Sequence, residues 1–519
     1  MPEKTGSGGR TAPLHPVSRR HLDELEGELG IFQHAIGSKP DPAHGYCVDD
    51  VARSLQVDLL HARAVGWASV SRSAWRSMRF LEDAFDPETG RLRNFRAIDG
   101  SWLEGVSSND SFGRAMLALG ETIGGAPDAR LFESGVALFG RALPAAGKMT
   151  SPRAQASLIL ACDAVLRSAG VAGSVDEREA DLRAAAAITL RRLATGLHAR
   201  FLDVARPGWP WAEGSLTYEN ALLPRALIVA GHRLGAGTML AIGLQVLDWL
   251  IEVQTSPQGG FSPVGNGWWP RGGTKSQFDQ QPIEATALLL AAEAAWNATR
   301  DPRYVNAMEL AYAWFLGGND LAKRIANPAR GACFDGLTAK GVNTNEGAES
   351  TLMWLIAAEH IRARRTADMI DVASLVQDAN ALLSGGKPAE ALEMARRAAA
   401  RSPRDRTVLN TLAKVHLRLG RLKEAEDALR ALRAIQPRAD ASVLLAQILI
   451  LDGRLEEAAR LIDEAERLDS RHGGVYIARG DLLARQGRTE QARASYERAR
   501  QVDPYRAAGA AAARLSALR

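Results

Sequence analysis

The stretch GYCVDDVARSLQVDLLHARA, residues 45–64, starts as a polar turn and continues as a long run of small and apolar residues. Two adjacent acids, Asp49 and Asp50, stand where a helix would begin. One acid there is common, because Asp accepts hydrogen bonds from the free N–H groups of the first turn and lies at the positive end of the helix dipole. A second acid adds repulsion. The pair therefore indicates either two solvent-exposed acids without a specific role or a site that uses carboxylates.

Five later segments repeat this layout of a polar turn followed by a long, nearly apolar helix. They are SSNDSFGRAMLALGETI, MTSPRAQASLILACDAVLRSA, SLTYENALLPRALIVAGHRL, SQFDQQPIEATALLLAAEAAW and NTNEGAESTLMWLIAAEH. With the first segment, they predict helices that begin near residues 49, 109, 152, 219, 281 and 345. A helix that is apolar on all sides is typical of a buried position. We therefore expect six buried helices.

More charged, amphipathic stretches alternate with these segments, as expected of outer helices. They lie near residues 18–29, 70–84, 130–143, 176–200, 239–253 and 302–316. Little β-strand signal is present. Six inner helices wrapped by six outer ones form an (α/α)6 toroid, in which all inner helices start at the same end. The fold class is therefore all-α, and the six polar turns should converge in one funnel.

The C-terminal third repeats with a period of about 34 residues. The segments GKPAEA (386–391), GRLKEA (420–425), GRLEEA (453–458) and GRTEQA (487–492) align, and prolines recur at matching places. This pattern resembles the tetratricopeptide repeat, a helix–turn–helix unit that stacks because one unit cannot bury its own apolar face. We expect about four repeats, an α-solenoid that binds a protein partner or packs against another copy or the first domain.

The domain organisation follows from these two sequence patterns, the alternating helices and the 34-residue repeat. We expect a flexible tail at residues 1–14, the barrel at 15–365, and repeats with a capping helix at 372–519. All eleven tryptophans precede residue 365, which separates the two folded parts by composition.

Composition excludes several classes of function. The chain has 519 residues and a net charge of +4, with no long basic run, which disfavours nucleic-acid binding. No apolar run is long enough for a membrane span or a signal peptide. Three scattered cysteines indicate a reducing compartment, so a cytoplasmic location is expected. Metal-binding and nucleotide-binding motifs are absent, so we expect neither a metal nor another cofactor.

Carboxylates and aromatic residues occupy the turns that should meet in the funnel. A pair of carboxylates can cleave a glycosidic bond, one as the acid and the other activating water or attacking the sugar. The catalytic candidates are Asp49, Asp50, Asp110, Glu284 and Glu346. Aromatic faces and hydrogen-bonding side chains suit a sugar. The substrate-binding candidates are Tyr46, Trp102, Glu104, Arg153, Trp211, Trp268, Trp269, Asp279, Gln280, Gln281 and Glu349.

Each candidate also has a structural interpretation. Asp49 and Asp110 suit an N-cap, and Glu284 suits the first turn of a helix after Pro282. Glu346 and Glu349, three residues apart, could form structural ion pairs. The recurrence of these residues at one end of one barrel favours a site.

The segments GYCVDDVARSL, WLEGVSSNDSFGRAMLALG, FDQQPIEATA and NTNEGAESTL resemble the six-hairpin glycosidase superfamily, in particular a bacterial group associated with glycosyltransferases. The resemblance covers residues 15–362 and implies a toroid that acts on carbohydrate. We therefore expect a glycoside hydrolase whose repeats bind a protein, with a glycosyltransferase as the expected partner. The alternatives are a glycoside phosphorylase, a sugar epimerase that would favour a histidine pair, and a non-catalytic glycan-binding or repeat scaffold.

Overall fold

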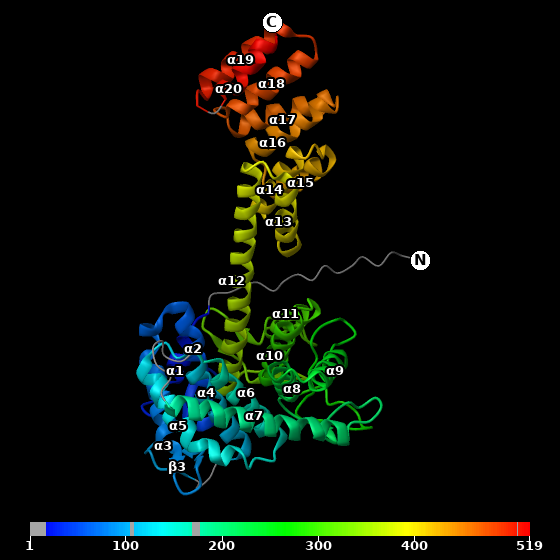
Figure 1. Ribbon diagram of the computed structural model, residues 1–519. Helices are drawn as coiled ribbons and strands as arrows, with labels where there is room; N and C mark the ends of the chain where they lie inside the picture. Colours follow the sequence, from blue (N-terminus) through cyan, green and yellow to red (C-terminus); the bar gives the residue numbers. More distant parts are fainter. Residues whose placement is uncertain (1–16, 104–107, 169–176, 506, 519) are drawn as a thin grey trace. The chain divides into compact units, whose positions relative to one another are not determined.

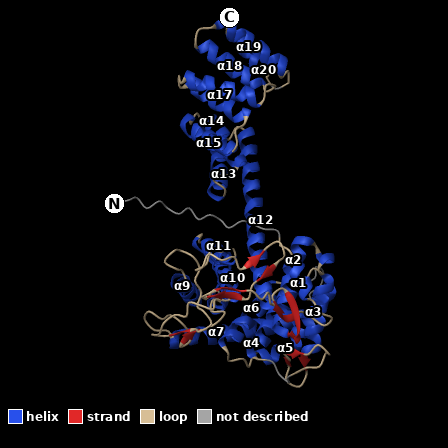
Figure 2. Cartoon of the chain, turned by 180° about the vertical axis from the view of Figure 1, so that it is seen from behind, coloured by secondary structure: helices blue, strands red, loops and turns tan. Residues whose placement is uncertain are grey.

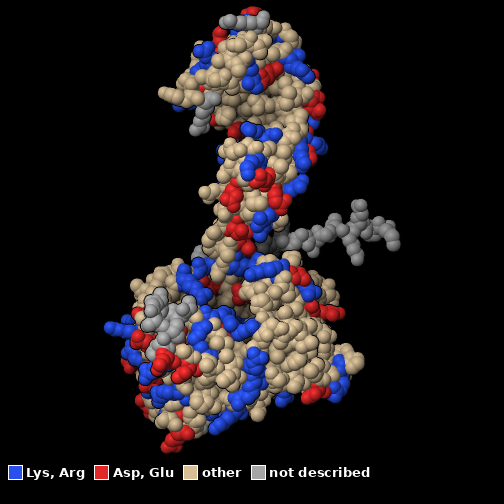
Figure 3. All heavy atoms as spheres, viewed as in Figure 1, with Lys and Arg blue, Asp and Glu red and all other residues tan. Residues whose placement is uncertain are grey.

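The computed structural model describes residues 17–103, 108–168, 177–505 and 507–518. The chain divides into two compact units, Met1–Ala363 and Arg364–Arg519. Among the described helices, none is both long and apolar enough to cross a membrane. On the face drawn in Figure 3, acidic and basic side chains are intermixed.

The first unit is the predicted (α/α)6 toroid (Figure 1). Its six inner helices are α2 (Val48–Val65), α4 (Asn109–Gly125), α6 (Pro152–Arg167), α8 (Leu222–Leu234), α10 (Pro282–Thr299) and the first part of α12 (Ala348–Ser384). Helices α2, α4, α6, α8 and α10 pack in that order. The ring closes through α12, because Thr286 of α10 donates to the Met353 carbonyl at 2.8 Å and His61 of α2 lies 3.2 Å from Glu359.

Small residues set the distance between two inner helices. A Cβ built on Gly120 of α4 would lie 2.4 Å from the carbonyl oxygen of Ala161 on α6. Gly113 and Gly124 face Ala154 and Ala164 of α6 in the same way. The glycines of α4 therefore allow its backbone to touch that of α6.

The outer layer consists of the helices that alternate with the inner ones along the chain. They are α1 (Arg20–Leu25), α3 (Ser71–Ala84), α5 (Ala129–Ala146), α7 (Glu177–Val204), α9 (Gly237–Val253) and α11 (Arg303–Phe315). Neighbouring outer helices α3, α5, α7 and α9 contact one another. A one-turn 3-10 helix, Trp67–Ser69, precedes α3. Helix α1 is shorter than expected, because the chain turns at Glu26 into an extended segment.

The loops that lead into the inner helices contain short strands that the sequence did not predict (Figure 2). Strands β1 (Phe32–Ile36), β2 (Lys39–Cys47) and β5 (Phe95–Arg96) form an antiparallel sheet in the order β1-β2-β5. The other strands form two-stranded pairs: β3 (Phe85–Asp86) with β4 (Arg91–Leu92), β6 (Ser215–Leu216) with β7 (Trp269–Pro270), β8 (Ala326–Asn327) with β9 (Ala332–Cys333), and β10 (Gly336–Thr338) with β11 (Gly341–Asn343). Since each strand precedes an inner helix, the strands gather at the end where those helices begin.

The second unit is built from helix pairs, as the repeat period predicts. It contains the last part of α12, α13 (Pro388–Arg401), α14 (Arg406–Arg418), α15 (Leu422–Ile435), α16 (Ala439–Leu451), α17 (Leu455–Leu468), α18 (Gly473–Arg485), α19 (Thr489–Val502) and α20 (Ala508–Ala517). The aligned glycines Gly386, Gly420, Gly453 and Gly487 have φ between +70° and +79°, which an L side chain rarely adopts.

The boundary between the units falls inside a helix. We expected the barrel to end at residue 365 and the repeats to start at 372, but α12 runs continuously from Ala348 to Ser384. The sequence RARRTADMIDV, residues 362–372, contains no glycine or proline that would end a helix. Its composition therefore favours a helix that continues through this boundary.

Candidate functional site

Six charged residues from four inner helices, or from the turns just before them, form two groups of ion pairs at the helix starts, and the adjacent Asp49 and Asp50 connect the two groups. Arg53 Nη1 lies 2.8 Å from Glu349 Oε2 and 3.4 Å from Asp50 Oδ1. Arg114 lies 3.3 Å from Asp49 and 2.9 Å from Glu219. We call Asp49, Asp50, Arg53, Arg114, Glu219 and Glu349 the acid–arginine ring. It joins α2, α4 and α12 with the turn that precedes α8.

Two further contacts extend this network to the remaining inner helices. Glu284 of α10 accepts hydrogen bonds from the backbone N–H of Glu219 and from the Asn220 side chain, the latter at 3.0 Å. Arg153 of α6 donates to the Tyr218 carbonyl at 2.7 Å and to Glu213 at 2.9 Å. The turn at residues 213–220 is therefore held by both helices.

The aromatic ring of Tyr218 connects two predicted site residues. Its hydroxyl donates to Asp110, and the Arg153 guanidinium lies 4.5 Å from the ring centroid. The Ser151 hydroxyl donates to the other oxygen of Asp110 at 2.9 Å. Asp110 thus fixes the start of α6 and the turn before α8.

Exposure separates the carboxylates of the ring. The side chain of Glu349 is 45% exposed, those of Asp49 and Glu219 are 21% and 16% exposed, and that of Asp50 is 7% exposed. Glu349 is therefore the carboxylate most open to a ligand.

Asp50 and Glu349 of the ring, together with the neighbouring Glu284, also differ in pKa. Burial raises the pKa of Asp50 to about 7, against the opposing effect of Arg53. Burial likewise raises the pKa of Glu284 to about 7. Burial also acts to raise the pKa of Glu349, but Arg53 and Arg114 outweigh it and hold that pKa below its ordinary value. Neighbouring carboxyl groups with divided pKa values are the arrangement that acid–base catalysis needs.

Asp49 and Asp110 are not N-caps, contrary to their structural interpretation. The N-cap of α2 is Cys47, whose thiol donates to Asp50 at 3.1 Å. The N-cap of α4 is Ser108, whose side chain accepts from the Ser111 N–H. Both aspartates therefore make side-chain contacts across the barrel instead.

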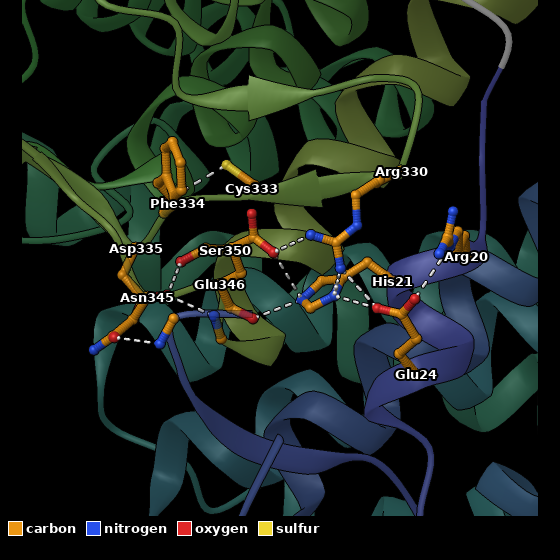
Figure 4. Close-up of polar contacts among 12 residues, drawn as sticks. Arg20, His21, Glu24, Arg330, Cys333, Phe334, Asp335, Asn345, Glu346 and Ser350 are labelled. Carbon is orange, nitrogen blue, oxygen red and sulfur yellow. Dashed lines mark hydrogen bonds and ion pairs between the residues drawn. The ribbon is translucent and has the colours of Figure 1, made fainter. Parts of the chain in front are cut away.

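Glu346 does not belong to the ring, so its assignment as a catalytic candidate is corrected. Figure 4 shows its carboxylate directed toward Arg330, 3.1 Å away, and beside His21. Its backbone carbonyl accepts from His21 Nε2 at 2.8 Å, and Arg330 also contacts Glu24. Glu346 is only 6% exposed and joins α1 to the segment before α12. Glu349, one helical turn later, occupies the ring.

Three aromatic and amide candidates, Tyr46, Trp211 and Gln280, are buried inside the protein, and Trp269 is partly buried. Trp211 has no exposed surface and donates its indole N–H to the Ser215 carbonyl at 3.0 Å. Gln280 is also fully buried, between Asp320 and Trp314. Tyr46 stacks on Phe32 at 4.9 Å. Trp269 stacks on Trp249 of α9 at 6.3 Å. Their burial corrects the assignment of Tyr46, Trp211 and Gln280 as substrate-binding residues.

The remaining described candidates are exposed or half-buried. Trp268 is 48% exposed, and Asp279 is exposed in the same long loop. Gln281 is half-buried at the start of α10. Trp102 is half-buried against Phe80. Glu104 lies outside the described residues, as does the expected tail at residues 1–14.

Sequence reasoning missed the two arginines that organise the ring. Arg53 follows Asp50 by three residues and Arg114 follows Asp110 by four, so a cation lies on the same helix face as each acid. This spacing was a usable signal. In the described part of the chain, no group of three or more His, Cys, Asp or Glu side chains could hold a metal ion.

The pKa of Asp50 predicts how stability depends on pH. Its folded-state pKa of about 7 exceeds the unfolded value, so the unfolded chain releases this proton first as pH rises. The stabilising contribution is complete below about pH 4 and is lost as pH approaches 7. From pH 5 to pH 8, we expect wild type to lose on the order of 2 kcal/mol of unfolding free energy relative to Asp50→Asn. Urea denaturation at both pH values measures this.

The control for this prediction is Asp279→Asn, because Asp279 is exposed. Its stability should follow that of wild type at both pH values. An Asp50→Asn protein whose stability also follows wild type would show that Asp50 does not titrate in this range.

Comparison with known proteins identifies the second unit. One family model described as tetratricopeptide repeat matches residues 382–448, and a second matches residues 439–464 and 473–498. The C-terminal region contains tetratricopeptide repeats. A thermophilic tetratricopeptide-repeat protein of Thermus thermophilus is 25% identical, covering 26% of this chain and 75% of its own, with a TM-score of 0.25.

The barrel resembles two solved structures at low identity. A sugar epimerase from a ruminal bacterium is 13% identical, covering 66% of this chain and 94% of its own, with a TM-score of 0.49. Cellobiose 2-epimerase from Spirochaeta thermophila is 12% identical, covering 65% and 92%, with a TM-score of 0.49. No curated protein matches this sequence.

Proposed function

We propose that the first unit is a carbohydrate-processing enzyme that cleaves a glycosidic bond at the acid–arginine ring. One observation carries the proposal: Asp50 and Glu349 contact the same Arg53 nitrogen, at 3.4 and 2.8 Å, while their pKa values are shifted in opposite directions. Asp50, with a pKa of about 7, can donate a proton to the leaving oxygen. Glu349, held ionised and open to solvent, can activate water or attack the anomeric carbon.

The test is product analysis with the purified full-length chain. We expect product from at least one member of a panel of α- and β-linked oligosaccharides, and none from an Asp50→Asn, Glu349→Gln double variant. Parallel reactions with and without inorganic phosphate distinguish hydrolysis from phosphorolysis. A wild-type protein that neither converts nor binds any sugar of the panel would contradict the proposal and favour a non-catalytic scaffold.

Sugar epimerisation is the second candidate, because two histidines lie near the ring. His34 and His44, on β1 and β2, contact edge to face with centroids 4.7 Å apart. The charge of His34 contributes to lowering the pKa of Glu349. Transfer of a proton to and from carbon would introduce deuterium at one sugar carbon in D₂O. Glycosidic cleavage leaves the carbon-bound hydrogens unchanged, so mass spectrometry of the product separates the two reactions.

The tetratricopeptide repeats suggest interaction with another protein. We propose that they recruit a protein that makes or modifies the same glycan, a glycosyltransferase being the specific expectation. Such a partner would deliver the substrate close to the barrel.

A further inference from the structure

The acid–arginine ring contains more acids than bases. Its carboxyl groups belong to Asp49, Asp50, Glu219 and Glu349. Each of the two arginines of the ring is shared by two carboxyl groups, two on Arg53 and two on Arg114. With all four acids ionised, the ring therefore has a net negative charge that its own arginines do not balance.

The groups next to the ring add to this excess of negative charge. They are Asp110, Glu213, Glu284 and Arg153. Asp50 and Glu284 have pKa values of about 7, so each is partly protonated at neutral pH. If both were neutral, five carboxylates would still face three arginines. His34 and Asp335 also lie near Glu349, but they are a cation and an anion and do not reverse the balance.

The two arginines of the ring indicate the sign of the electric field there. Burial by itself acts to lower the pKa of a guanidinium group. At Arg53 the largest contribution against burial comes from Glu349, and the pKa is raised. At Arg114 it comes from Glu219, and the pKa is raised well above its ordinary value. The opposite holds at Arg225 of α8, where burial prevails and lowers the pKa. The negative field is therefore a property of the ring.

The ring offers unused acceptors and one unused donor. In Asp49, Glu219 and Glu349, one carboxylate oxygen contacts an arginine, and the other has no partner among the residues that the structure describes. All three side chains are partly exposed. Arg53 is only 3% exposed, and its Nη2 is a buried donor without an acceptor in the same part of the chain. Since Nη1 of this guanidinium contacts Asp50 and Glu349, the unused donor lies beside these carboxyl groups.

We propose that the ring binds a cationic amino sugar, which carries a free ammonium group next to a hydroxyl group. The ammonium group donates to the unused carboxylate oxygens and supplies the positive charge that the ring lacks. The neighbouring hydroxyl oxygen accepts from Arg53 Nη2. A neutral or N-acetylated sugar supplies only the acceptor, and a uronic acid adds charge of the sign already in excess. This inference names the substrate class and rests on the proposed function only for the location of the site.

Isothermal titration calorimetry with the full-length chain tests the proposal. The probes are glucosamine and galactosamine, their N-acetylated and neutral counterparts and the matching uronic acids, as monosaccharides and as α- and β-linked disaccharides. Titrations are made below the pKa of the sugar amine. We expect at least one amino sugar to bind about tenfold more tightly than its counterparts at low salt, with a smaller difference at high salt. Equal affinities, tighter binding of a uronic acid, or no binding of any amino sugar would overturn the proposal.

Charge variants locate the effect. Glu219→Gln keeps the size of the side chain and removes one negative charge, so the preference for the amino sugar should fall from about tenfold to about threefold. Asp49→Asn should act in the same way, and circular dichroism shows whether each variant is folded. Glu346→Gln is the control, because it removes a carboxylate outside the ring and should keep the full preference. An unchanged preference in a folded ring variant would contradict the assigned position.

Crystals of the complex with the preferred amino sugar give a direct reading. An amino nitrogen within hydrogen-bond distance of at least two ring carboxylates supports the proposal, whereas an amino group directed into solvent would overturn it. Binding of the amino sugar without turnover of any sugar would contradict glycosidic cleavage and leave this inference standing. Turnover of neutral and amino sugars with equal kcat/KM would do the reverse.

Discussion

Glu349→Gln is expected to lower kcat/KM by about 1,000-fold, the middle of the range for loss of a catalytic carboxylate. Glu349 is the most exposed carboxylate of the acid–arginine ring, and two arginines hold it ionised. Glutamine keeps the shape of the side chain but can neither accept a proton nor attack a sugar carbon. The measurement is kcat/KM on the best sugar of the oligosaccharide panel.

The matched control is Glu346→Gln, the same substitution three residues earlier. Glu346 contacts Arg330 and His21 outside the ring, so this variant should lose stability but keep its kcat/KM while folded. Circular dichroism on both variants separates loss of fold from loss of chemistry. Near-normal activity in a folded Glu349→Gln protein would remove Glu349 from the mechanism.

Gly120→Ala is expected to lower the free energy of unfolding of the barrel by about 3 kcal/mol, at the upper end of the usual cost of overpacking. The added Cβ would lie 2.4 Å from the Ala161 carbonyl oxygen and 2.8 Å from its Cα. Both atoms belong to the backbone of α6, so they cannot move aside as a flexible side chain can. Urea denaturation, followed by circular dichroism, measures the change.

Gly196→Ala provides the opposite case. Gly196 lies within α7, and a Cβ built there has no neighbour within 4 Å. The same substitution should therefore raise stability by about 0.5–1 kcal/mol through helix propensity alone. If Gly120→Ala proved as stable as wild type, the α4–α6 contact would have to be looser than described.

The toroid and the repeats could be predicted because each depends on a pattern that extends over many residues. Six nearly apolar helices alternating with amphipathic ones leave few ways to bury the first type. The short strands could not be predicted, since pairs such as Phe85–Asp86 with Arg91–Leu92 form within loops and are too short for a periodic signal. The continuity of α12 could not be predicted from the domain bounds, because a change in composition between two domains does not say whether one helix spans them.

The candidate site was predicted at the level of location and only partly at the level of residues. Asp49, Asp50 and Glu349 meet in the ring, as their shared place at helix starts suggested. Trp211 and Gln280 were assigned from residue type, and type does not say whether a loop folds inward. Arg53 and Arg114 could have been predicted from their positions three residues after Asp50 and four residues after Asp110.

The sequence distance between the members of the ring has a consequence for synthesis on the ribosome. Arg53 emerges almost 300 residues before Glu349, its partner from α12. A nascent chain that has not yet released α12 leaves this guanidinium without that carboxylate, and an unpaired charge disfavours burial. Domains generally form as units during translation. Ligand binding at the ring would therefore report that the whole first unit has been made, and C-terminal truncations before residue 348 should remain open to proteases.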